Sequence, residues 1–297
     1  MNISVNLGAR ASQHSLLLHG ASVEYWDYAP VQTTAQTRTI LVVHGFRGDH
    51  HGLERVVEAL PQMRLIMPDL PGFGLSAALP KDPHDVERYG RFVLELIEVL
   101  QLGPDTVLLG HSFGSIVASH FAAGHTHRIA ELVLVNPIAA PALEGPKAVL
   151  SKLAEFYYLA SAKLPARAGN ALLRSRLIVH LMSVTMAKTK DQELLHFIHA
   201  QHHAYFSLFA NRDMLLESFR ASVGGTVRQV ASRLKLPVLL VAGAEDEIAP
   251  LADQHKLLPL LPEAELTVIP GVGHLIHYET PQAAAAAITD FLDRHPA

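Results

Sequence analysis

The chain contains no cysteine, and this absence excludes several kinds of chemistry. Without thiols there is no disulfide framework, no cysteine-based metal site and no cysteine nucleophile. Long apolar runs are missing too, because stretches such as residues 132–143 are interrupted by Pro137 and Pro141, so we expect no membrane span. The first residues lack a basic segment followed by an apolar one, so we expect no signal peptide and a cytoplasmic protein.

The chain also has little excess charge. Its 24 Lys and Arg residues against 28 Asp and Glu residues give a net charge of −4, and the basic residues form no run. We therefore expect no nucleic-acid partner. The 297 residues, of which 49% are hydrophobic, suffice for one large core of helices and strands.

Short apolar runs alternate with helical patterns in the first half of the chain. From Thr39 onward the runs are continuously apolar, as is typical of parallel strands that are covered on both faces. The first two strands are close enough in sequence to form an antiparallel hairpin. The expected strands are Ser15–His19, Val23–Tyr28, Thr39–His44, Arg64–Met67, Thr106–Leu109 and Glu131–Val135, and the expected helices are Gly52–Leu60, Pro83–Leu100 and Ser112–Ala123.

The alternation stops between Asn136 and about Arg233, and it resumes at Pro237. We therefore predict a core formed by residues 1–136 and 234–297, with an all-helical cap, residues 137–233, set over the strand ends. The expected cap helices are Lys147–Lys163, Ala171–Met186, Gln192–Phe209 and Asp213–Ala221. After the cap we expect strands at Pro237–Ala242 and Glu265–Ile269, a helix near Leu251–Leu261, and a last helix over Pro281–Arg294 with Thr280 as its N-cap.

The pentapeptide Gly110-His111-Ser112-Phe113-Gly114 lies between a predicted strand and a predicted helix. A Gly-x-Ser-x-Gly sequence in this context is typical of a sharp turn that exposes the serine hydroxyl. The two glycines fit because a side chain at either position would crowd the neighbouring strand and helix. Ser112 is therefore the candidate nucleophile.

A serine needs a base to take its proton and an acid to orient that base. Two strands near the C-terminus each end in a polar segment, 243–247 after the first and 270–274 after the second. Ligands collect at the carboxyl edge of parallel sheets, so we expect these segments to approach Ser112. Their candidate residues are Asp246 as the acid and His274 as the base, in the chain order serine, acid, histidine.

Five segments in this order resemble the α/β-hydrolase-fold serine hydrolases of the esterase and lipase type that carry a helical cap. They are His44-Gly45-Phe46, Asp69–Ser76, the Ser112 turn, Gly243-x-x-Asp246 and Gly273-His274. The resemblance implies a mostly parallel eight-stranded sheet flanked by helices. It also implies Asp246 rather than Glu245 or Glu247 as the acid, and the amides of Phe46 and Phe113 as oxyanion donors.

Several other residues compete for a role. His277 is the nearest rival among 19 histidines, but His274 follows the last strand directly through two glycines. His111 is interpreted as a packing residue. Arg47 either faces the pocket and binds a substrate carboxylate or is a surface residue on a turn. His199 and His203 have the spacing of metal ligands, but no carboxylate cluster accompanies them, so we expect no metal and no cofactor.

The main functional prediction is a serine hydrolase that cleaves an ester, thioester or lactone of a small, largely apolar acyl substrate through an acyl-enzyme. Some of the large apolar cap residues are expected to line its pocket and most to dock the cap. Two alternatives stay open on the same fold. One is a hydrolase that cleaves carbon–carbon bonds of ring-cleavage products. The other is a ligand receptor with negligible turnover. The oligomeric state is not predicted.

Overall fold

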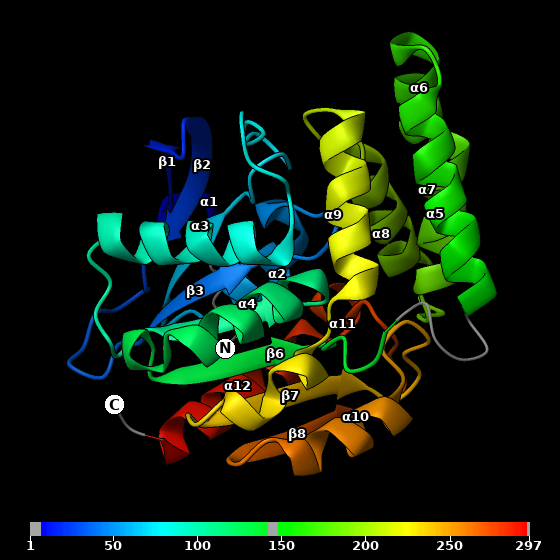
Figure 1. Cartoon of the computed structure of the whole chain (residues 1–297). Helices are drawn as coiled ribbons and strands as arrows, with labels where there is room; N and C mark the ends of the chain where they lie inside the picture. The colour runs from blue at the N-terminus through cyan, green and yellow to red at the C-terminus, as the bar shows by residue number, and fades with distance from the viewer. Residues whose placement is uncertain (1–6, 142–147, 296–297) are drawn as a thin grey trace.

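A single eight-stranded sheet runs through the molecule, which a computed structural model describes over residues 7–141 and 148–295 (Figure 1). The strand order is β1-β2-β4-β3-β5-β6-β7-β8. Strand β2 pairs antiparallel with β1 and with β4, and every pair from β4 to β8 is parallel. The predicted sheet, mostly parallel and eight-stranded with an N-terminal hairpin, is confirmed.

The central strands are short and buried along their whole length. Strands β5, β6 and β7 expose no residue, which explains their continuously apolar sequences. The strands are β1 (Ala11–Leu18), β2 (Ala21–Tyr28), β3 (Thr39–Val43), β4 (Arg64–Pro68), β5 (Val107–His111), β6 (Glu131–Val135), β7 (Val238–Gly243) and β8 (Ala264–Ile269).

Helices cover both faces of this sheet. Helices α3 (Val86–Val99) and α4 (Phe113–Gly124) pack in one apolar cluster, and α2 (Glu54–Ala59) and α12 (Pro281–Arg294) contribute to the other. The short helices α1 (Leu7–Arg10), α10 (Leu251–Leu257) and α11 (Ile276–Glu279) complete the core.

The start of α12 differs in one detail from the prediction. Pro281 opens the helix as expected, and the helix ends at Arg294 as expected. Thr280 stands at the N-cap position, but its hydroxyl makes no capping hydrogen bond and is buried without a partner. Thr280 is therefore the N-cap residue, as predicted, but its side chain does not cap the helix.

Within the described residues, five α-helices lie between β6 and β7 and stand together beside the sheet (Figure 1). We call them the cap helices. The predicted single helix over 171–186 is broken at Arg174 and Ser175, because Ser175 has an extended backbone. The predicted first residue of the cap helices, Lys147, lies outside the described residues, and the division into two domains stays a prediction. The cap helices are α5 (Ala148–Lys163), α6 (Ala166–Leu173), α7 (Arg176–Met186), α8 (Gln192–Tyr205) and α9 (Arg212–Gly224).

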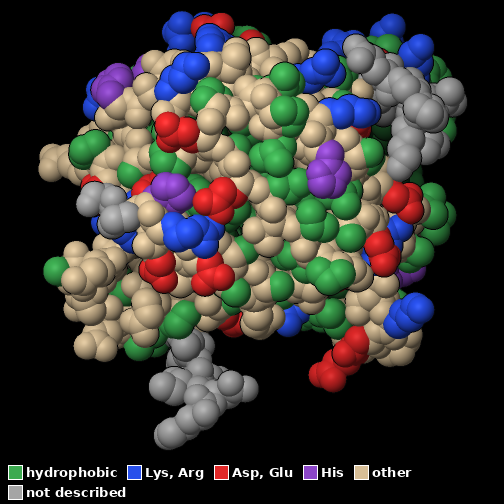
Figure 2. Space-filling view, turned by 90° about the horizontal axis from the view of Figure 1, so that it is seen from below, with side chains coloured by type: hydrophobic (Ala, Val, Ile, Leu, Met, Phe, Trp, Pro, Cys, Tyr) green, Lys and Arg blue, Asp and Glu red, His purple; other side chains and the backbone are tan. Residues whose placement is uncertain are grey.

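The surface seen from below the view of Figure 1 mixes acidic, basic and hydrophobic side chains (Figure 2). No single sign of charge covers this face. Within the described residues, no helix is both long enough and apolar enough to cross a bilayer.

Candidate active site

Ser112 lies at the turn between β5 and α4, in a backbone conformation that few residues other than glycine adopt. Its φ is 53° and its ψ is −118°. Such strain persists only where the surroundings enforce it, and it is common at functional positions. The turn lifts the Ser112 side chain from the carboxyl end of the sheet, as the pentapeptide predicts.

The two glycines of the pentapeptide allow this turn by their lack of a side chain. A Cβ atom at Gly110 would lie 2.3 Å from the carbonyl oxygen of Gly114. A Cβ atom at Gly114 would lie 2.0 Å from the carbonyl oxygen of Val43 on β3. Helix α4 can therefore approach the sheet closely only if both positions are glycine, which confirms the crowding expected from the sequence.

The structure brings Ser112, His274 and Asp246 into one hydrogen-bonded chain. The His274 Nε2 atom lies 2.7 Å from Ser112 Oγ, and its Nδ1 atom lies 2.8 Å from Asp246 Oδ2. Both the His274 and Asp246 side chains are buried. Three segments that are far apart in sequence thus meet at one edge of the sheet. This arrangement can pass a proton from a serine hydroxyl to an imidazole that a carboxylate orients.

Asp246 is held in its ionised form by several partners. Burial alone would raise the pKa of its carboxyl group, but the charge and hydrogen bond of His274 outweigh this and lower that pKa to about 2. The amides of Ile248 and Ala249 also donate to Asp246 Oδ1. Asp246 is therefore a charged acceptor for the imidazole.

Asn136 is a further partner of Asp246 that the sequence reasoning did not identify. Its side-chain Nδ2 donates to Asp246 Oδ2 at 2.8 Å and to the Gly273 carbonyl at 3.2 Å. The residue has a φ of +47°, a conformation that asparagine tolerates better than most residues. A polar residue at the end of β6 was the available signal.

The rival acids and histidines lie elsewhere. Glu245 and Glu247 are exposed, and Glu247 pairs with Lys188. His277 packs its ring against His111, with ring centroids 4.2 Å apart, and is not bonded to Ser112. Burial, and next the nearby charge of His274, lowers the pKa of His111 to about 3, so its ring is neutral. His111 is a packing residue, as predicted.

Two backbone amides in the segments next to Ser112 have no acceptor within the described residues. The amides of Phe46 and Phe113 donate no hydrogen bond to any residue within the described ranges. Both residues line the same cavity as Ser112. A Cβ atom at Gly45 would lie 3.3 Å from Ser112 Cβ, which shows how closely the loop before Phe46 approaches the turn.

The loop that carries Phe46 is fixed by His44 and by the segment after β4. The His44 Nδ1–H donates to the Gly45 carbonyl at 2.8 Å, and His44 Nε2 accepts from the Leu70 amide at 2.9 Å. Asp69 accepts from the amide and the ring of His50 and from the Leu75 amide. The position of the Asp69 carboxylate requires glycine at residue 74, because a Cβ atom there would lie 2.1 Å from Asp69 Oδ2. Gly74 also has a φ of +55°. The segment therefore supports the site without entering it.

A cavity of about 300 Å³ opens above Ser112 and His274. Core and cap both contribute to its wall, which is mostly apolar, so the site suits a hydrophobic acyl group. Five large cap residues line it, whereas others, such as Phe156, are exposed to solvent. The five are Tyr158, Met182, Met186, Tyr205 and Phe206.

Comparison with known proteins decides the family. A family model described as alpha/beta hydrolase fold matches residues 38–281, which include Ser112, Asp246 and His274. The chain belongs to the alpha/beta hydrolase fold family.

Proteins similar to this chain are named for several activities. The pimeloyl-[acyl-carrier protein] methyl ester esterase of Chromobacterium violaceum is 27% identical over 265 residues, which cover 89% of this chain and 97% of that protein. The monoacylglycerol lipase ABHD6 of Homo sapiens is 23% identical over 259 residues, covering 86% and 75%. The solved thermophilic esterase of Thermogutta terrifontis shares the fold at a TM-score of 0.76, with 22% identity, covering 97% of this chain and 100% of that one.

Arg47 of this α/β hydrolase is not a surface residue, because it is buried and is one of the residues that line the cavity. Its side chain is buried and has no acidic partner within the described residues. The guanidinium donates to the carbonyls of Phe206 at 2.9 Å and Leu173 at 2.8 Å, and lies 3.4 Å from the Tyr158 hydroxyl. Arg47 thus connects the Phe46 loop to the cap helices. The surface alternative is therefore wrong, and binding of a substrate carboxylate by Arg47 stays a prediction.

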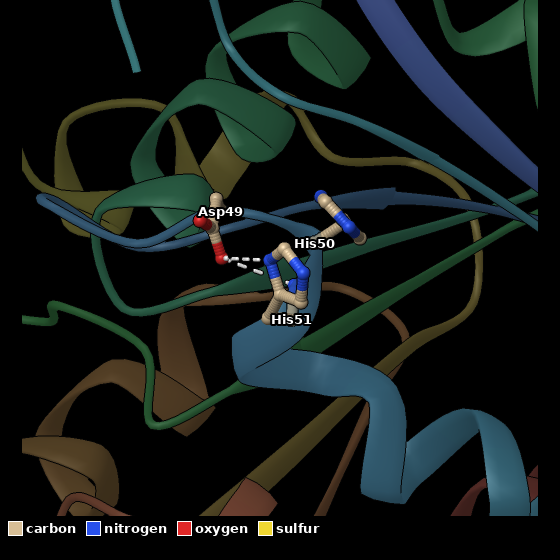
Figure 3. Close-up of side chains that lie close together, drawn as sticks. All are labelled: Asp49, His50 and His51. Atoms are coloured by element: carbon tan, nitrogen blue, oxygen red, sulfur yellow. Dashed lines mark hydrogen bonds and ion pairs between the residues drawn. The ribbon is translucent and has the colours of Figure 1, made fainter. Parts of the chain in front are cut away.

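Asp49, His50 and His51 form a compact group of side chains with metal-binding chemistry (Figure 3). Asp49 accepts from the His51 amide at 3.0 Å and lies 3.3 Å from the His51 ring, whereas the His50 ring is bonded to Asp69. The Asp49 carboxylate chiefly caps the turn that starts at His50. Asp49 Oδ2 and His51 Nδ1 are buried without a hydrogen-bond partner among the described residues, but the His50 ring is already bonded to Asp69, and we assign this group no metal.

The cap histidines are used in packing. Ser183 Oγ lies 2.6 Å from His199 Nδ1 and 2.7 Å from His202 Nδ1, so this hydroxyl joins α7 to α8. The His203 ring stacks on His180 instead of converging with His199 on a common point. The spacing of His199 and His203 along α8 therefore does not produce a ligand set among the described residues.

Proposed function

We propose that this α/β hydrolase is a serine esterase that cleaves a carboxylic ester, thioester or lactone with a largely apolar acyl group. The observation that carries this proposal is the bonded chain Ser112–His274–Asp246 at the base of an apolar cavity. Related proteins that are named as a methyl ester esterase and a monoacylglycerol lipase support this class of substrate.

In the proposed mechanism, His274 Nε2 takes the proton of Ser112 as the hydroxyl oxygen attacks the acyl carbonyl. Asp246 accepts a hydrogen bond from Nδ1–H and stabilises the imidazolium that forms. The amides of Phe46 and Phe113 donate to the oxyanion of the tetrahedral intermediate. His274 then protonates the leaving group, and water hydrolyses the acyl-Ser112 ester by the reverse sequence.

The first prediction concerns Ser112. In the Ser112→Ala variant we expect ester hydrolysis to fall by about four orders of magnitude or more, since no acyl-enzyme can form. The measurement is turnover of a series of p-nitrophenyl esters, together with the intact mass after incubation with a fluorophosphonate. The native protein should gain one adduct, located on Ser112 by peptide mapping.

The matched control is Ser222→Ala, which removes another serine hydroxyl from the cavity wall but not from the bonded chain. This variant should keep both the adduct and most of the turnover. Undiminished turnover in Ser112→Ala would refute the assignment. A well-folded native protein that gains no adduct would instead favour the receptor alternative.

A further inference from the structure

The cap helices expose an unusual number of large apolar side chains. On α7, Leu177 is 78% exposed, Leu181 63% and Val184 50%. These three residues are spaced by four and three positions, so they lie on one face of the helix. We call them the outer stripe of α7. On α5, Leu153 and Phe156 are 64% and 66% exposed.

The opposite face of α7 belongs to the active-site cavity. Met182 and Met186, one helical turn apart, line the cavity together with Ser112. Val179 and Ser183, which are buried, complete the inward side. The width of one helix, about 10 Å, therefore separates the outer stripe from the cavity. Figure 1 shows α5, α6 and α7 at the edge of the molecule, away from the sheet.

The same helices concentrate positive charge. Residues 148–190 contain seven Lys and Arg residues and a single Glu, although acidic residues outnumber basic ones 28 to 24 in the whole chain. Six of these basic residues are exposed and form no ion pair with a carboxylate of the described residues. They are Lys152, Lys163, Arg167, Arg174, Arg176 and Lys190.

We propose that the outer stripe of α7 and its flanking basic residues form a docking surface for an anionic phospholipid bilayer. Apolar side chains surrounded by Lys and Arg match the boundary between acyl chains and anionic headgroups. The face is a projecting helix and not a groove, and grooves are what partner helices bind. Pairing of two copies through this face would bring like charges together. Docking would place α7, whose inward face forms part of the cavity wall, at the lipid surface.

The test measures binding to lipid and not hydrolysis, so its outcome is independent of the proposed esterase activity. The Ser112→Ala protein, which leaves the lipid intact, is sedimented with vesicles of phosphatidylcholine alone or mixed equally with phosphatidylglycerol. We expect binding to the mixed vesicles to exceed binding to phosphatidylcholine by about tenfold or more, because each Lys or Arg side chain near an anionic surface adds favourable binding free energy. High salt should weaken the binding.

Two double variants in the same background test the two parts of the surface. Leu177→Ser with Leu181→Ser, and separately Arg167→Gln with Arg176→Gln, should each reduce binding to the mixed vesicles by about tenfold or more. The apolar control is Leu17→Ser with Leu75→Ser. These two leucines are 76% and 57% exposed, and both lie outside the cap helices. The charge control is Arg91→Gln with Arg294→Gln. Both controls should bind like the parent protein.

Three results would overturn the proposal. The first is no sedimentation with either kind of vesicle, which would leave an acidic protein as the partner of the basic surface. The second is equal binding to both kinds, which would remove the role of charge. The third is unchanged binding of the Leu177 and Leu181 double variant, with circular dichroism confirming that it is folded.

Discussion

At the scale of single residues, the site depends on side chains that never touch a substrate. Asn136 is the clearest example, because it donates to the same Asp246 oxygen that accepts from His274. Its amide keeps that oxygen in position and favours the charged carboxylate. Its φ of +47° restricts the residues that can replace it without strain.

We predict that Asn136→Gly lowers kcat by about tenfold to a hundredfold, with a smaller change in KM. Glycine adopts the positive φ without strain, so the loss reports the missing hydrogen bond to a charged group, worth about 1.5–3 kcal/mol. The measurement is steady-state hydrolysis of a p-nitrophenyl ester. Asn136→Asp is the informative comparison, since a second carboxylate beside Asp246 should raise the pKa of the pair and shift the acidic limb of the kcat profile upward. Full activity in both variants would contradict a positioning role.

At the scale of elements, the cap helices are joined to the core by a buried guanidinium. Arg47 follows Phe46 directly, has a φ of +58°, and binds carbonyls at the end of α6 and just after α8. The Phe46 ring in turn packs on Tyr158 and Phe219, both on cap helices. The loop that carries one proposed oxyanion donor and the cap therefore fix each other's position.

Replacing Arg47 with Met should destabilise the protein by about 2–4 kcal/mol, because two buried carbonyls lose their donors. We expect cleavage by trypsin to begin earlier in the cap helices, and kcat to fall because the Phe46 loop is released. The measurements are urea unfolding, a time course of limited proteolysis and ester turnover. Arg91→Met, which changes an exposed arginine of α3, should leave all three unchanged. Equal behaviour of the two variants would exclude Arg47 as a connection between the cap and the core.

The elements also show why the sequence predicted the sheet and the bonded residues better than the side chains that hold them in position. Periodicity and strand ends located the sheet, the Ser112 turn, Asp246 and His274, because each follows a local pattern. The contacts of Arg47 and Asn136 were not predicted because their partners lie more than a hundred residues away, and no local pattern encodes such a pair. The break between α6 and α7 was missed for the same kind of reason. Arg174 there binds the carbonyl of Phe209, which lies 35 positions further along the chain.

At the scale of the whole molecule, several histidines are buried in neutral form and link the fold to pH. Burial, with neighbouring imidazoles adding to it, lowers the pKa of His202 to about 3 and that of His277 well below its usual value. In the unfolded chain both titrate near pH 6.5. Between about pH 3 and 6.5 the unfolded state therefore binds more protons than the native state, so stability falls as the pH falls through this window. Asp246 adds a second loss between its unfolded pKa, about 4, and about pH 2.

The whole-molecule prediction is that the free energy of unfolding declines steeply from about pH 6.5 downward and that His202→Asn makes this decline shallower. One histidine that is protonated only on unfolding contributes up to about 1.4 kcal/mol per pH unit, and the Asn variant lacks that contribution. Asparagine retains a polar atom near Ser183, so the variant should fold at neutral pH even with its cavity. The measurement is urea unfolding at a series of pH values. The exposed His255→Asn control should follow the native slope. If His202→Asn keeps that slope too, His202 is already protonated in the native protein, and the acid sensitivity of the fold must come from other buried groups.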